Sequence, residues 1–199
     1  SDPNSVCGRC ISGGDEVSLH PICATDGDRT QRLALLNQYV EHIFLGAPEN
    51  LSLAQKHRSW SWLAQPFDLE EIPSPIPREP KKGQFNILHI PHRPAQMGTK
   101  VILEAIEQLK AKKLPVVFNL LVPELFFDSA TILSKLKECD LLIEQIGRES
   151  TGALGLLAMA YGKTVISGNS SQAKSAWEQL KVNPVLDSNP ENLVARLES

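Results

Sequence analysis

Long apolar runs are missing from the sequence, and none approaches the roughly 18 consecutive apolar residues that a membrane-spanning helix requires. The first residues also lack the basic and then apolar layout of a secretory signal peptide. Neither sign of charge is in large excess, because 20 Lys and Arg stand against 23 Asp and Glu. We therefore expect a cytoplasmic protein that has no transmembrane segment and does not bind nucleic acid.

Cysteine is scarce, and three of the four cysteines lie within the first 23 residues. This uneven placement does not predict a disulfide framework. The spacing of Cys7, Cys10, His20 and Cys23 permits a tetrahedral zinc site. The Gly-rich insert between the two pairs favours the alternative, reduced thiols in an irregular segment. Cys139, which precedes a predicted strand, is expected in the core.

The N-terminal third of the chain shows two kinds of composition. Residues 1–28 are rich in Gly, Ser, Asp and Pro and lack periodicity, which predicts an irregular leader. Residues 29–65 predict a helix that starts after Asp28, a strand within 42–47 and a second helix at about 48–57.

A proline-rich linker, residues 66–83, separates this part from the rest of the chain. Its five prolines between residues 66 and 80 remove backbone donors and disfavour helix, so the segment is expected to be extended. In residues 84–199, short apolar runs alternate with amphipathic stretches, which predicts βαβ units. The expected fold class is therefore α/β, with a Rossmann-like, doubly wound parallel sheet.

Ten elements are expected in residues 84–199. The strands are predicted at 85–90, 115–122, 140–146, 164–167 and 184–187. The helices are predicted near 98–113, 128–138, 151–162, 172–181 and 190–198. The Gly-Lys-Thr at 162–164 lacks the upstream glycine of a phosphate-binding P-loop and is interpreted as a helix stop.

Two loops are candidates for a ligand site, because open parallel sheets bind ligands outside the carboxyl ends of their strands. The loop after the first of these strands carries Arg93, a planar donor suited to phosphate, and Gly98 and Thr99 open the next helix. The alternative is that Arg93 is a solvated cation. On that alternative, His89 and His92 are satisfied strand-end or loop residues.

The second loop places Glu149, Ser150, Thr151 and Gly152 before a helix that is otherwise apolar. Ser150 or Thr151 can cap the helix, and Gly152 lets a ligand approach the backbone. Such a helix start suits a phosphate, although ordinary N-capping explains the same residues.

The order of these motifs resembles a known family. The stretch ILHIPHRPAQMGTKVILEAIEQLK, followed by DLLIEQI and TGALGLLAMAYGKTVI, is similar to the C-terminal, donor-binding lobe of retaining nucleotide-sugar glycosyltransferases. These enzymes have the GT-B architecture and include glycosyltransferase family 4 and its relatives. The resemblance covers about residues 38–199 and is most specific over 84–168. By this resemblance, residues 29–65 are a helix-strand-helix remnant of the interlobe region.

The resemblance implies a lobe that binds a UDP, GDP or ADP sugar and presents the sugar to an unknown acceptor. Arg93 would contact the diphosphate, and Gly98–Thr99 would face the donor. Residues Glu149–Gly152 would lie beside the sugar and phosphates, with Glu144 and Gln145 matching a supporting acidic-Gln pair. The resemblance implies no required metal or other cofactor, because Arg, Lys and helix dipoles offset the charge of the leaving diphosphate. No catalytic residue is assigned.

Two positions depart from the family pattern. Met97 stands where the family usually has a lysine, and Leu157 stands where it has a glutamate that binds the ribose. Loss of both charge-assisted contacts would weaken donor binding by about two to four powers of ten.

Other functions therefore stay open. The segment before the linker is too short for a second Rossmann unit, so an acceptor lobe or a partner chain is expected elsewhere. One alternative is a degenerate, non-catalytic glycosyltransferase-like module for binding or assembly. The other alternative is an unrelated Rossmann-like enzyme that binds a phosphosugar.

Overall fold

The computed structural model describes most of residues 83–199 and parts of residues 31–72. The described residues are 31, 34–36, 38–46, 59–63, 66, 68, 70, 72, 83–122, 129–146, 150–179, 181 and 185–199, except for the side chain of residue 172. The chain divides into two compact units, residues 1–46 with 50–63 and residues 47–49 with 64–199.

The first unit contains a two-stranded parallel sheet made of β1 (His42–Leu45) and β2 (Ser59–Trp62). A hydrogen bond of 3.0 Å between Nε2 of His42 and Oγ of Ser61 links the two strands. The strand expected within residues 42–47 is thus confirmed. The sequence did not predict β2, because its Ser-Trp alternation has the period of a strand over only four residues.

Other expectations for the N-terminal part are tested only in places. The described residues 31, 34–36, 38 and 39 are helical, as expected after Asp28. The leader, the helix expected at 48–57 and most of the linker lie outside the described residues.

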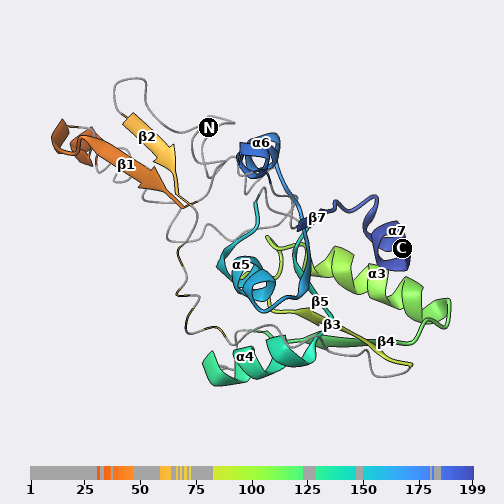
Figure 1. Ribbon diagram of the computed structural model, residues 1–199. Coiled ribbons are helices and arrows are strands. Elements are labelled where there is room, and N and C mark those ends of the chain that lie inside the picture. The colour runs from red at the N-terminus through yellow and green to blue at the C-terminus, as the bar shows by residue number, and fades with distance from the viewer. Residues whose placement is uncertain are drawn as a thin grey trace. The chain divides into compact units, whose positions relative to one another are not determined.

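The second unit is an α/β domain whose strands and helices alternate along the chain (Figure 1). Its strands are β3 (Phe85–His89), β4 (Val116–Leu120), β5 (Leu141–Gln145), β6 (Thr164–Ser167) and β7 (Val185–Asp187). Its helices are α3 (Thr99–Ala111), α4 (Ser129–Glu138), α5 (Ala153–Ala160), α6 (Ser171–Gln179) and α7 (Leu193–Glu198). All ten expected elements are present, and their ends differ from expectation by up to three residues.

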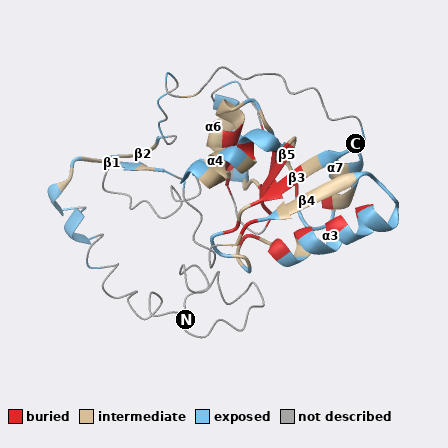
Figure 2. Cartoon of the chain, turned by 90° about the horizontal axis from the view of Figure 1, so that it is seen from below, coloured by how far each residue is buried: buried red, intermediate tan, exposed pale blue. Residues whose placement is uncertain are grey.

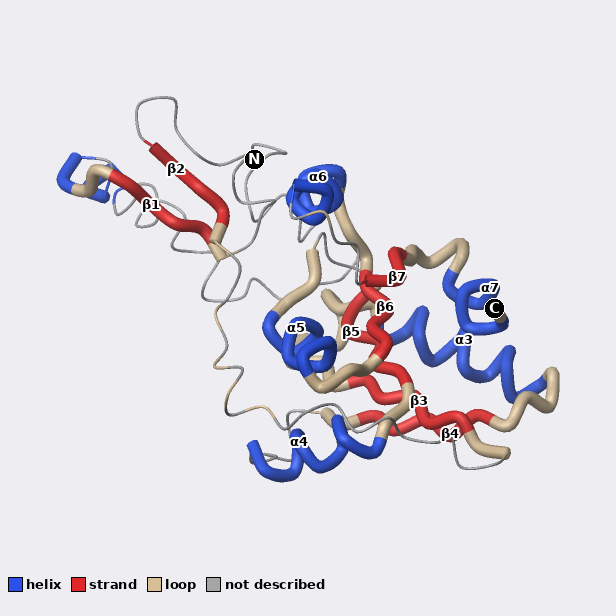
Figure 3. Tube along the Cα trace, viewed as in Figure 1, coloured by secondary structure: helices blue, strands red, loops and turns tan. Residues whose placement is uncertain are grey.

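The five strands form one parallel sheet in the order β4-β3-β5-β6-β7. The chain moves from β3 outward to β4 and then returns to β5 on the other side of β3, so the order reverses between β3 and β5. Figure 3 shows α3 and α7 on one side of the sheet and α4, α5 and α6 on the other. This doubly wound α/β arrangement confirms the expected fold class.

The face of the sheet under α3 and α7 carries the first core cluster. In α3, Ile102, Ala105, Ile106 and Leu109 recur at intervals of three and four residues and are buried, because this spacing places them on one helix face. They pack with residues from three strands and from α7, namely Ile87, Leu141, Ile143, Ile166 and Leu193. Figure 2 shows buried residues on α3 and in the adjoining strands.

The opposite face carries the second core cluster, under α4 and α5. Side chains next to those of the first cluster point this way, because successive residues of a strand face opposite sides of the sheet. The cluster consists of Leu88, Leu121, Leu136, Cys139, Leu142, Ala158 and Val165. Cys139 is buried as expected, and β5 is buried along its whole length.

The Gly-Lys-Thr segment ends α5, as expected. Gly162 has a φ of 71°, in the left-handed region that favours glycine. Its amide donates to the carbonyl of Met159, and the amide of Lys163 donates to the carbonyl of Ala158. These two bonds satisfy carbonyls in the last turn of the helix, and β6 follows directly.

Candidate functional site

The two candidate loops leave the sheet at the edge where all five strands end, here called the carboxyl edge. The first loop, residues 90–98, follows β3, and the second, residues 146–152, follows β5. Strand order reverses between these two strands. Ligands of open α/β sheets bind at such a reversal, outside the carboxyl ends of the strands.

The first loop forms a tight turn before α3. The amide of Met97 donates to the carbonyl of Arg93, and the amide of Thr99 donates to the carbonyl of Pro94, both at 3.0 Å. Gly98 is the N-cap residue of α3 and has a φ of 73°. This value lies in the left-handed region, which glycine adopts without strain because it has no Cβ. The side chain of Arg93 is exposed, and its Nη1 donates to Oε1 of Gln96 at 3.4 Å.

The two loops meet through their backbones. The amide of Ile146, which follows β5, donates to the carbonyl of Met97 at 3.0 Å. This bond places the start of the second loop directly beside the turn that precedes α3. Ile146, the first residue of the second loop, therefore lies next to the first loop at the carboxyl edge.

His89 ties three elements together beneath this junction. It is fully buried, and its Nδ1 lies 2.7 Å from the carbonyl oxygen of Ile143, which only accepts, so Nδ1 carries the proton and donates. Its Nε2 then accepts from Oγ1 of Thr99 at 2.9 Å. Desolvation by burial lowers the pKa of His89 to about 4, against a smaller opposing contribution from the hydrogen bond to Ile143.

His89 is therefore neutral, and its two hydrogen bonds link β3 to β5 and to the first residue of α3. The alternative that sequence offered for it, a satisfied strand-end residue, is confirmed. Thr99, which the resemblance assigned to the donor side, has its hydroxyl group committed to this buried ring.

The start of α5 is met by a carboxyl group from β5. The amide of Gly152 lies 2.9 and 3.0 Å from Oε1 and Oε2 of Glu144, and the amide of Gly155 donates to Oε1 at 3.1 Å. Glu144 is only 4% exposed. The backbone donors at which the sequence predicted an approaching ligand are thus hydrogen-bonded to a side chain of the chain itself.

Gln145 lies beside Glu144 at the end of β5. Its Nε2 donates to the carbonyl of Ser150 and so holds the second loop against the strand. Its Oε1 is buried and has no hydrogen-bond partner among the residues that the structure describes. The supporting pair that the resemblance named therefore contacts the second loop directly, Glu144 through Gly152 and Gln145 through Ser150.

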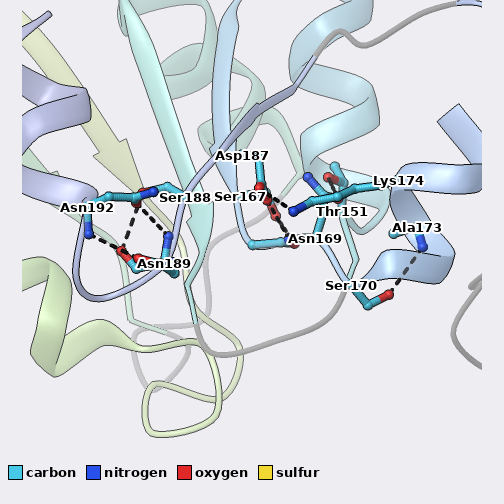
Figure 4. A network of polar contacts seen from close by, with 11 residues as sticks. Thr151, Ser167, Asn169, Ser170, Ala173, Lys174, Asp187, Ser188, Asn189 and Asn192 are labelled. Atoms are coloured by element: carbon cyan, nitrogen blue, oxygen red, sulfur yellow. Dashed lines mark hydrogen bonds and ion pairs between the residues drawn. The ribbon is translucent and has the colours of Figure 1, made fainter. Parts of the chain in front are cut away.

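A row of polar side chains continues along the carboxyl edge from α5 to β7 (Figure 4). The hydroxyl of Thr151 donates to Oδ1 of Asn169 at 3.5 Å, and the amide of Asn169 donates to Oδ1 of Asp187 at 3.0 Å. Nζ of Lys174 lies 2.7 Å from Oδ2 of Asp187. The sequence did not indicate Asn169, Lys174 or Asp187 as site residues, although Asn169 follows a predicted strand and Asp187 ends one.

The two departures from the family pattern have structural counterparts. Met97 is 4% exposed, so its side chain belongs to the interior and not to the edge. Leu157 is half-buried and packs against the second core cluster. Neither position places a charged group at the candidate site.

The structure describes most, but not all, of the expected site residues. Arg93, Gly98 and Thr99 lie in or after the first loop, and Ser150, Thr151 and Gly152 lie in the second. Glu149 lies outside the described residues, as do the four residues of the N-terminal zinc expectation, Cys7, Cys10, His20 and Cys23. Within the part of the chain that the structure describes, no group of three or more His, Cys, Asp or Glu side chains is placed to hold a metal ion.

Comparisons with known proteins add no family to this description. Neither a protein-family model nor a curated protein matches the chain.

Among the helices of the described residues, none has the length and apolar character needed to cross a membrane.

Proposed function

We propose that residues 84–199 form the donor-binding lobe of a retaining glycosyltransferase of GT-B architecture. The lobe binds a UDP, GDP or ADP sugar at the carboxyl edge, and the sugar passes to an acceptor held by another lobe or a partner chain. The observation that carries this proposal is the hydrogen bond between Ile146 and Met97. It brings the two expected donor loops together at the reversal of strand order, where such folds bind nucleotides.

The distribution of charge favours the α3 side of the edge for the diphosphate. Arg93 is exposed beside the start of α3, and among the described residues no side chain caps the N-terminus of that helix at Gly98. A guanidinium group and a helix N-terminus both stabilise negative charge, including the charge that develops on a leaving diphosphate. The start of α5 already accommodates the carboxyl group of Glu144.

A second candidate function is a non-catalytic module that keeps the fold for binding or assembly. The interior position of Met97 and the packing of Leu157 favour it, because both replace charged family residues with core side chains. Cytoplasmic location, which the sequence led us to expect, is part of either proposal.

Isothermal titration with UDP, GDP, ADP and their common sugar conjugates separates the two candidates. The glycosyltransferase proposal predicts saturable binding to the full chain. Arg93→Ala should weaken this binding by roughly tenfold to a hundredfold, because it removes a charge-assisted contact. Arg196→Ala, which removes an exposed arginine from the last turn of α7, is the matched control and should leave binding unchanged.

Two results would count against the donor site. The absence of binding at millimolar nucleotide supports the non-catalytic module instead. Binding that Arg93→Ala leaves unchanged rejects Arg93 as the phosphate contact.

A further inference from the structure

The first turn of α5 has the properties of an anion site. The amides at a helix N-terminus lack carbonyl partners within the helix, and the helix dipole favours negative charge there. In this structure both oxygens of the Glu144 carboxyl group lie within hydrogen-bond distance of the Gly152 amide, and Oε1 also meets the amide of Gly155. The group that fills the site is thus a carboxyl group of the preceding strand.

The backbone of α5 is shaped around this carboxyl group. A Cβ built on Gly152 would lie 2.9 Å from Oε1 of Glu144, and one built on Gly155 would lie 2.5 Å from Oε2. Both distances are shorter than any ordinary contact between a side-chain carbon and an oxygen. Glycine at these two positions therefore allows the carboxyl group to approach the helix. Glu144 is only 4% exposed, so its carboxyl group is enclosed by the protein.

A phosphate at this place would need the same two amides. It would have to displace Glu144, and an ionised Glu144 left nearby would repel it. Oε1 of the neighbouring Gln145 is a buried acceptor that has no hydrogen-bond partner in the described part of the chain. This atom cannot donate a hydrogen bond to a phosphate oxygen.

We infer that Glu144 is a built-in anion that excludes phosphate from the start of α5. It is a specificity-determining residue of the carboxyl edge, and its side chain decides which of the two loops accepts a phosphate group. The exclusion holds for any phosphate ligand. Its consequence for a sugar donor, with the diphosphate confined to the α3 side, rests on the proposed function.

The test follows the backbone amides of Gly152 and Gly155 by NMR while inorganic phosphate is added to the full chain. In the unaltered protein these two amide signals should not move at tens of millimolar phosphate. In Glu144→Ala they should move saturably over the same phosphate range, which corresponds to an affinity at least roughly tenfold above the limit set by the unaltered protein. Glu107→Ala, which removes an exposed glutamate from α3, should behave like the unaltered protein.

Glu144→Ser is the second variant, because its hydroxyl group keeps a small polar side chain at this position if the alanine variant does not fold. Saturable phosphate shifts at Gly152 and Gly155 in the unaltered protein would overturn the inference. So would a folded Glu144→Ala or Glu144→Ser whose two amides ignore phosphate. Since the probe is inorganic phosphate read at named amides, failure of nucleotide binding elsewhere on the edge leaves this result intact.

Discussion

The amide of Gly155 donates a hydrogen bond of 3.1 Å to Oε1 of Glu144, a residue eleven positions earlier at the end of β5. This contact fastens the first turn of α5 to the strand that precedes it. It also explains a glycine inside an otherwise apolar helix, where alanine has the higher helix propensity. Glycine is required at residue 155 because the carboxyl group of Glu144 leaves no room for a Cβ, and not because of its backbone dihedral angles.

Gly155→Ala is expected to destabilise the protein by about 1 to 3 kcal/mol, although the same change in an ordinary helix stabilises it. The added methyl group would meet Oε2 of Glu144 and Cγ2 of Thr151, each at 2.5 Å. Urea unfolding followed by circular dichroism gives the free energy of unfolding. Gly46→Ala, where an added Cβ would meet no atom within 4 Å in the described part of the chain, is the control and should change that free energy little. Equal stability of Gly155→Ala and the unaltered protein would contradict the fitted contact.

His89 is expected to make stability depend on pH between 6.5 and 4. Because its pKa is about 4 in the folded protein and 6.5 in the unfolded chain, the unfolded chain binds the proton first as pH falls. Stability from this group is therefore complete above pH 6.5, and about 3 kcal/mol is lost on descending to pH 4. Unfolding titrations at several pH values should show a shallower decline for His89→Gln, and identical slopes would contradict the assignment.

Thr99 is expected to matter through its hydroxyl group. Thr99→Val removes the donor to Nε2 of His89 and leaves a buried acceptor without a partner, at a cost of about 1 to 3 kcal/mol. Thr99→Ser keeps the hydroxyl and should remain closer to the unaltered protein. Thermal unfolding of the two variants makes the comparison, and a valine variant as stable as the serine variant would show that the bond contributes nothing.

Lys163 is expected to stabilise the end of α4. Its Nζ donates to the carbonyls of Lys137 and Cys139 at 2.8 and 2.9 Å, where the helix dipole favours a cation. Lys163→Met keeps the apolar stem and should lower the free energy of unfolding by about 1 kcal/mol. Lys110→Met removes an exposed lysine whose Nζ forms a surface ion pair with Glu107, and it is expected to have a much smaller effect. If Lys110→Met lowered the free energy of unfolding as much as Lys163→Met, Lys163 would not be a specific cap of α4.

Much of the fold could be predicted because its signals are local. The three- and four-residue spacing in α3, the short apolar strands and the Gly-Lys stop after α5 each depend on neighbours in the sequence. The start of α7 was predicted at residue 190 but lies at Leu193. The reason is that Oδ1 of Asn189 accepts from the amides of Glu191 and Asn192 and holds a turn there.

The site could be predicted less completely, because its contacts join residues distant in the chain. The two loops were expected together from the rule for parallel sheets, and the structure places Ile146, the first residue of the second loop, beside Met97 of the first. The role of Glu144 was missed, since nothing local indicates that a strand carboxyl group reaches a helix eight residues later. A signal was present in hindsight, namely glycine at both 152 and 155 opposite an acidic residue at the end of a buried strand.

The most direct measurement is an NMR titration of the full chain with UDP, GDP and ADP. It follows the Arg93 side chain, the amides of Lys100 and Val101 in the first turn of α3, and the amides of Gly152 and Gly155. We predict saturable shifts at Arg93 and in α3, with the two glycine amides unmoved. The account is contradicted if no nucleotide moves Arg93 or the α3 amides at millimolar concentration, or if the shifts fall on Gly152 and Gly155 instead.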